Sequence, residues 1–141
     1  MNYYKKAEEY IKNYKALKIH IETLTKQLKE IEETGLKATS LEYTGRTGPG
    51  STVENAILKM EREEEIIRAK INKVGLMVER IERAIETLNE TERYIITERY
   101  IARKQWWQIA YATKYGERHC RRIRTEAIKQ ISICLFGLEA T

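Results

Sequence analysis

The chain has 141 residues, of which 42% are hydrophobic and 33% are charged. This balance indicates a folded protein with much solvated helix surface and excludes an intrinsically disordered chain. No apolar run approaches the roughly 18 residues that a membrane span needs, and the N-terminal segment lacks the apolar core of a secretory signal. Cys120 and Cys134 stand alone, without metal-ligand spacing, so we expect a reduced, cytoplasmic protein without membrane contact.

The net charge of +5 is unevenly distributed along the chain. Residues 1–90 hold 16 Lys or Arg and 16 Glu, whereas residues 91–141 hold 10 Lys or Arg and 5 Glu. The whole excess of positive charge therefore lies in the last third, which points to a polyanionic partner for that part of the chain.

The first predicted element is a heptad helix from about residue 3 to residue 33. Apolar residues recur there at alternating steps of four and three, which is typical of a coiled-coil seam. All nine seam positions are apolar: Tyr3, Ala7, Tyr10, Tyr14, Leu17, Ile21, Leu24, Leu28 and Ile31.

A connector is predicted at about residues 35–51. Gly35 is suited to end the first helix, and the Gly-Pro-Gly run at residues 48–50 cannot continue one. Ser51 and Glu54 stand at the spacing of a capping box, which predicts the start of a second long helix.

The second long helix is predicted from about residue 52 to residue 89. Ten of its eleven seam positions are apolar, and Glu64 is the exception: Val53, Ile57, Met60, Glu64, Ile67, Ile71, Val74, Val78, Ile81, Ile85 and Leu88. Because the two seams are similar in length, we expect an antiparallel coiled-coil hairpin within one chain. The alternative is that each seam pairs with another chain.

The last third of the chain is predicted to form several short helices, and not one long coiled-coil helix. Asn89 and Glu92 have the spacing of a capping box. Two short helices then follow, separated by a turn at residues 114–116, with a basic second helix, which is the pattern of a helix-turn-helix. Their predicted inner faces are Trp106, Ile109 and Ala110 on the first and Cys120, Ile123, Ala127 and Ile131 on the second.

The predicted fold is therefore all-α, with a coiled-coil helical hairpin at residues 1–89 and a helix-turn-helix domain at residues 90–141. The recognition helix spans about residues 117–129 and would enter the major groove of double-stranded DNA. The predicted base-reading residues are Glu117, Arg118, His119, Arg121 and Arg122. The predicted phosphate contacts are Arg103, Lys104, Lys114, Arg124 and Lys129.

Residues 98–131 resemble the C-terminal part of the ArpU-type phage transcriptional regulators. The shared pattern is Arg99-Tyr100-Ile101, then Trp106 followed by Ile109-Ala110, a turn, and a basic helix ending in Ala127-Ile128. The pattern is also similar to region 4 of sigma factors, which reads promoters. The resemblance implies regulation of late phage or prophage genes by promoter binding, in a bacterial host cell.

Several interpretations remain open at the level of sequence. RNA polymerase and a second copy of the chain are further partners that a regulator would have. The alternatives to a regulator are a small terminase subunit, which recognises DNA for phage packaging, and a coiled-coil adaptor that does not bind DNA. The apolar run at residues 131–138 is predicted either to pack back on the helix-turn-helix or to form a dimer contact. No catalytic constellation is present, so we expect neither an enzyme nor a metal or other cofactor.

Overall fold

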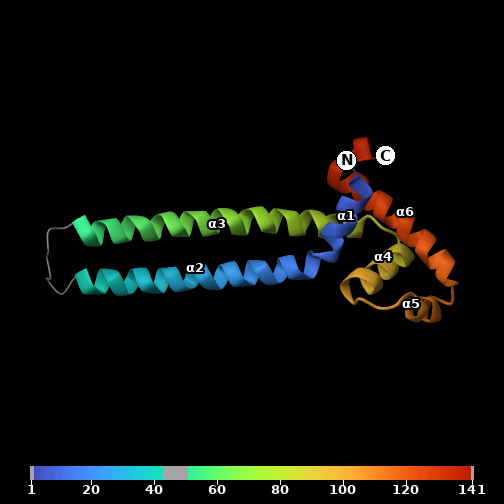
Figure 1. The fold of residues 1–141 in the computed structure, drawn as a ribbon, viewed down its shortest axis with the longest axis horizontal. Helices are drawn as coiled ribbons and strands as arrows, with labels where there is room; N and C mark the ends of the chain where they lie inside the picture. Colours follow the sequence, from blue (N-terminus) through green and yellow to red (C-terminus); the bar gives the residue numbers. More distant parts are fainter. Residues whose placement is uncertain (1, 43–50, 141) are drawn as a thin grey trace. The chain divides into compact units, whose positions relative to one another are not determined.

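The computed structural model describes residues 2–42 and 51–140, and every element in these residues is helical (Figure 1). This confirms the predicted all-α class. In chain order the elements are α1 (Tyr3–Lys12), α2 (Tyr14–Glu42), α3 (Ser51–Glu86), α4 (Glu90–Ile96), η1 (Thr97–Ile101), α5 (Trp106–Thr113), α6 (Glu117–Phe136) and η2 (Leu138–Ala140).

The chain divides into two compact units. Unit 1 comprises Met1–Leu17 and Leu76–Thr141, and unit 2 comprises Lys18–Gly75. This division differs from the predicted boundary at residues 89 and 90. The physical reason is that the start of the first long segment and the end of the second carry apolar side chains that pack with the C-terminal helices. Both therefore join the core of unit 1.

The first helical segment is broken at Asn13, where a single heptad helix had been predicted. Asn13 has φ −92° and ψ −1°, and its N–H donates to the Glu9 carbonyl at 3.0 Å. Its own carbonyl accepts from the Leu17 N–H at 2.8 Å. Asparagine is a poor residue for a helix interior because its side chain competes for backbone hydrogen bonds. The break separates α1, which belongs to unit 1, from the long helix α2.

Unit 2 consists of the parts of α2 and α3 that run side by side in opposite directions (Figure 1). Leu24 of the predicted first seam is only 4% exposed. Arg68 of α3 donates to Glu32 of α2 at 3.1 Å and lies 4.0 Å from Glu64. Glu64, the charged exception in the second seam, is therefore accommodated by an arginine that also links the two helices.

The predicted helix end at Gly35 was wrong, because α2 continues through this glycine to Glu42. A glycine inside a helix costs only about 1 kcal/mol relative to alanine, which the hydrogen bonds of the continuing helix offset. A Cβ added at Gly35 would lie 3.8 Å from the Sδ of Met60, so α3 lies close beside it. Residues 43–50 of the predicted connector lie outside the described residues. The side chain of Ser51 also lies outside them, so the predicted capping box of Ser51 and Glu54 stays a prediction.

Unit 1 is held together by a core to which five elements contribute. Its fully buried isoleucines are Ile11 of α1, Ile96 of α4, and Ile128 and Ile131 of α6. Small residues allow the helices to approach closely, because Ala7, Ala84 and Ala127 are buried in the same cluster. The turn after α3 adds Leu88, and η1 adds Tyr100.

α3 ends at Glu86, three residues before the predicted end, and α4 begins at Glu90 with Asn89 as its N-cap. The Asn89 side chain accepts from the Glu92 N–H at 2.8 Å, and the Glu92 side chain accepts from the Asn89 N–H at 3.1 Å. This confirms the predicted box. α4 then runs directly into the π-helical turn η1.

α5 and α6 are separated by a turn at residues 114–116. Lys114 ends α5 in the left-handed conformation, with φ 63°, and its N–H donates to the Ala110 carbonyl at 2.8 Å. The predicted inner faces are confirmed by burial, since Trp106, Ile109, Cys120, Ala127 and Ile131 are at most 8% exposed. Trp106, Ile109 and Cys120 form a second core cluster, against which Ala110 and Ile123 pack. Ile95 of α4 completes this second cluster.

α6 extends to Phe136, so most of the terminal apolar run continues the helix. The ring of Phe136 lies 5.3 Å from that of Tyr3 and 6.0 Å from that of Tyr10. Two predicted seam residues of the first segment thus pack on the end of α6. Within the chain, this run contacts α1 and does not lie free.

Candidate nucleic-acid interface

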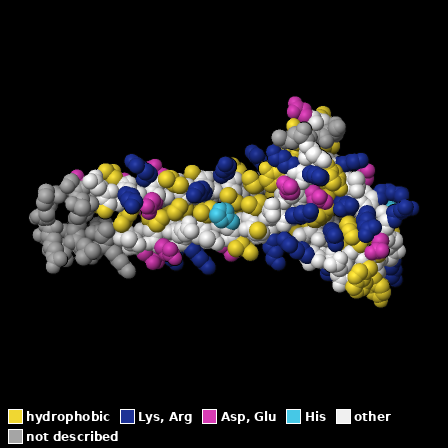
Figure 2. Space-filling model, viewed as in Figure 1, with side chains coloured by type: hydrophobic (Ala, Val, Ile, Leu, Met, Phe, Trp, Pro, Cys, Tyr) yellow, Lys and Arg dark blue, Asp and Glu magenta, His cyan; other side chains and the backbone are white. Residues whose placement is uncertain are grey.

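The outer face of α6 carries a stripe of cations opposite its buried face. Arg118, Arg122 and Lys129 lie within roughly 40° of one another around the helix axis, given 3.6 residues per turn. All three are exposed, whereas Cys120, Ala127 and Ile131 on the opposite side are fully buried. We call Arg118, Arg122 and Lys129 the basic face. Figure 2 shows Lys and Arg side chains gathered over unit 1.

The predicted base-reading residues all lie exposed in the first two turns of α6, namely Glu117, Arg118, His119, Arg121 and Arg122. Two of them lie at the edges of the basic face and touch aromatic rings. The His119 ring meets the Tyr115 ring edge-on with centroids 4.9 Å apart, and the Arg121 guanidinium lies 5.7 Å from the Trp106 ring.

Trp106 is surrounded by three arginines. Besides Arg121, the guanidinium of Arg99 lies 4.9 Å from its ring and that of Arg124 lies 5.3 Å from it. Each such contact stabilises by about 0.5–2 kcal/mol, depending on desolvation. The indole therefore orders arginines from η1 and α6 around one buried side chain.

The five predicted phosphate contacts lie in different surroundings. Arg103 is exposed in the left-handed conformation with φ 57°, and Lys114 is exposed in the turn. Lys129 lies 3.4 Å from Glu126 on the surface. Lys104 pairs with Glu98, and this hydrogen bond raises the pKa of the Lys104 amine.

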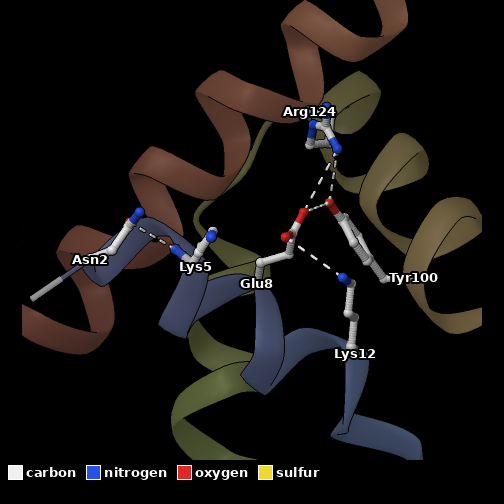
Figure 3. A network of polar contacts seen from close by, with 6 residues as sticks. All are labelled: Asn2, Lys5, Glu8, Lys12, Tyr100 and Arg124. Carbon is white, nitrogen blue, oxygen red and sulfur yellow. Dashed lines mark hydrogen bonds and ion pairs between the residues drawn. The ribbon is translucent and has the colours of Figure 1, made fainter.

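Arg124, the fifth, points into unit 1, where it takes part in a network that also includes Tyr100 and Glu8 (Figure 3). Arg124 donates to the Tyr100 hydroxyl at 3.3 Å, and that hydroxyl donates to Glu8 Oε2 at 2.6 Å. Arg124 and Lys12 each form an ion pair with Glu8 at 3.7 Å. The Arg124 side chain is 24% exposed.

Sequence reasoning missed Glu8 and Tyr100 as members of this network. They lie 92 residues apart, and Glu8 stands among the polar positions of a heptad pattern. The only signal in the sequence was that Tyr100 is an aromatic residue suited to a core. A tyrosine hydroxyl needs a hydrogen-bond partner when it is buried.

Replacing Tyr100 by phenylalanine is expected to lower the free energy of unfolding by about 1–3 kcal/mol at neutral pH, because Glu8 and Arg124 lose a buried hydrogen-bond partner. Urea unfolding measures this difference. Tyr111→Phe is the matched control, since Tyr111 is 86% exposed. An equal loss in both variants would contradict the role of the network.

The same residue makes stability depend on pH in the alkaline range. Burial, followed by the hydrogen bond to Glu8, raises the pKa of Tyr100 above its ordinary value. The folded protein therefore holds this proton more tightly than the unfolded chain does. The stabilisation is fully present below about pH 10, the ordinary tyrosine pKa, and is lost as pH rises above it. Tyr100→Phe should show a shallower alkaline loss than the wild type.

An aromatic stripe lies on the outer side of α5 and the turn. Trp107 is 65% exposed, Tyr111 86% and Tyr115 43%. Together with Lys114 they line an open depression of about 780 Å³. Trp106 is thus the core tryptophan and Trp107 the surface one.

The described ranges, 2–42 and 51–140, contain no cluster of His, Cys or acidic residues able to hold a metal ion. Within the same ranges, no helix combines the length and the apolar composition that crossing a bilayer requires.

Fold and surface together define a small all-helical protein with a cation-rich helix face. Residues 3–133 match the family described as "Protein of unknown function (DUF722)", and the chain belongs to this family. Neither the curated proteins nor the solved structures contain a match to it.

Proposed function

We propose that this chain is a sequence-specific, double-stranded DNA-binding regulator of phage or prophage genes, and not an enzyme. In this proposal α5, the turn and α6 form a helix-turn-helix, and residues 117–129 of α6 enter the major groove. The parts of α2 and α3 in unit 2 form a coiled-coil hairpin, available to RNA polymerase or to a second copy of the chain.

One observation carries the proposal: the basic face of α6 is exposed along its length while the opposite face is buried in the core. Arg118 and Arg122 stand one turn apart near the start of the helix, where a recognition helix contacts base edges. Arginine is the most frequent reader of guanine, through two parallel hydrogen bonds to O6 and N7.

The surroundings of α6 support the same proposal. The left-handed Lys114 ends α5 and allows α6 to start in a new direction after only three residues. Arg103, Lys104, Lys114 and Lys129 are exposed, which suits contacts to phosphates that position a protein on the duplex. Arg124 is reassigned from this set, because its guanidinium is directed at Glu8 and Tyr100.

The test is duplex binding by the full chain as a function of salt. With about four phosphate contacts, counterion release predicts that affinity falls roughly 100-fold between 50 and 200 mM salt. Fluorescence anisotropy with a labelled duplex measures it. Absence of duplex binding at 50 mM salt, or binding that salt does not weaken, would rule out the proposal.

A footprint of the bound protein on phage DNA distinguishes regulation from packaging. Protection at a promoter is expected for a regulator. Protection confined to a packaging start site would favour the small terminase subunit, and binding to acidic proteins but not to DNA would favour an adaptor.

A further inference from the structure

Unit 1 contains a cavity of about 520 Å³ that lies apart from the basic face of α6. Its walls come from α1 and the break after it, from η1 and the turn that follows, and from the middle of α6. Neither Arg118 nor Arg122 lines it.

Cations dominate the wall of this cavity. Lys12, Arg99, Arg103 and Arg124 line it, and Glu8 is the only carboxylate among the lining residues. The formal charge of this lining is therefore +3. Like charges that converge around one space repel one another, and low-dielectric walls strengthen that repulsion.

Glu8 compensates only part of this charge. It accepts from Tyr100 at 2.6 Å and forms ion pairs with Lys12 and Arg124, both at 3.7 Å (Figure 3). In addition, the Nε of Arg124 is buried and has no hydrogen-bond partner among the described residues. A partly buried guanidinium with an unmet donor is stabilised by further negative charge nearby.

The other two arginines are placed by irregular backbone. Arg99 lies in the π-helical turn η1, and it is held by the Trp106 ring and by donation to the Lys104 carbonyl at 2.9 Å. Arg103 has φ 57°, a conformation that costs a non-glycine residue energy. Thus both arginines reach the cavity from backbone that departs from regular helix.

We propose that this cavity is an anion site that accepts a phosphate group. Phosphate suits it better than a carboxylate, because a phosphate carries up to two negative charges and three acceptor oxygens, enough for several cations at once. Arginine forks from η1 and α6 supply paired donors, and Lys12 supplies a mobile ammonium at the rim, where its side chain is 55% exposed.

The first experiment titrates the full chain with inorganic phosphate and pyrophosphate at constant ionic strength. Above the dissociation constant, each tenfold rise in anion concentration is expected to raise the thermal midpoint by roughly 3–8 °C, whereas chloride has no such effect. A midpoint that responds to both anions only as it responds to chloride would overturn the proposal.

The matched variants separate this site from the basic face. K12Q with R103N removes two cations, and asparagine tolerates the left-handed backbone at position 103. This variant is expected to keep its fold and lose the phosphate response. The double variant R118A/R122A is expected to keep the response. The reverse pattern would place the bound anion on the basic face and contradict the site.

A second titration identifies the source of the phosphate group. If it is a backbone phosphate of DNA, K12Q/R103N weakens duplex binding about as much as it weakens phosphate binding, and duplex abolishes the phosphate response. If it belongs to a free phosphorylated ligand, K12Q/R103N weakens duplex binding only by the one phosphate contact proposed for Arg103, and duplex leaves the phosphate response in place. Both results support the anion site, and neither requires that the proposed regulator function be correct.

Discussion

Replacing Ile11 by alanine lowers the free energy of unfolding of unit 1 by about 2–5 kcal/mol, the usual cost of truncating a fully buried isoleucine. Ile11 has no exposed surface and belongs to the same cluster as Ile96, Ile128 and Ile131. The cavity left behind would lie where α1 packs against α6, and a helix of ten residues cannot collapse into it without losing its other contacts.

Tryptophan fluorescence during urea unfolding measures this loss, because the only two tryptophans, Trp106 and Trp107, both lie in α5 of unit 1. Ile19→Ala is the matched control: Ile19 is 54% exposed, and its truncation should change stability by no more than about 0.5 kcal/mol. If a fragment of residues 91–141 folded as stably as the full chain, α1 would not stabilise this core, and the prediction would be wrong.

The double variant Arg118→Ala and Arg122→Ala is expected to weaken specific duplex binding by about 2–6 kcal/mol, if each arginine reads one base and contributes 1–3 kcal/mol of discrimination. Both side chains are exposed and lie on the side of α6 opposite its buried face. Their removal should therefore leave the fold unchanged while sequence preference relaxes at two positions.

The control for this experiment is Arg62→Ala with Lys70→Ala, which removes the same charge from exposed positions on α3 in unit 2. Anisotropy on a specific and a scrambled duplex, with circular dichroism to verify folding, compares the two variants. Equal weakening in both would mean that total charge, not the basic face, governs binding. Full affinity in the Arg118 and Arg122 variant would remove α6 as the recognition helix.

Local patterns predicted much of the fold because they reflect local physics. The capping box of Asn89 and Glu92 is a contact over three residues, and the inner faces of α5 and α6 follow from helical periodicity and apolar side chains. Gly35 shows the limit of such patterns: its cost is about 1 kcal/mol, and the helix around it outweighed that cost.

Distant contacts could not be predicted in the same way. The heptad pattern runs without interruption through Asn13, so nothing in it separates the seam residues that pack on Phe136 from those of unit 2. Arg124 is held inward by Glu8, Tyr100 and Trp106, and a contact with a residue as distant in sequence as Glu8 could not be predicted. The exposure of Arg118 and Arg122 was predictable because both lie opposite the apolar face of one helix.

The packing of α1 on α6 has a consequence for how the chain folds as it is made. α1 is synthesised well before α6, and its partner surface includes Phe136 at the end of that helix. Unit 2 consists only of residues 18–75, so it can assemble while translation of the later residues continues. The apolar side of α1, with Ala7 and Ile11, must therefore stay uncovered until α6 has been synthesised, and exposed apolar surface of this kind makes a growing chain prone to aggregate.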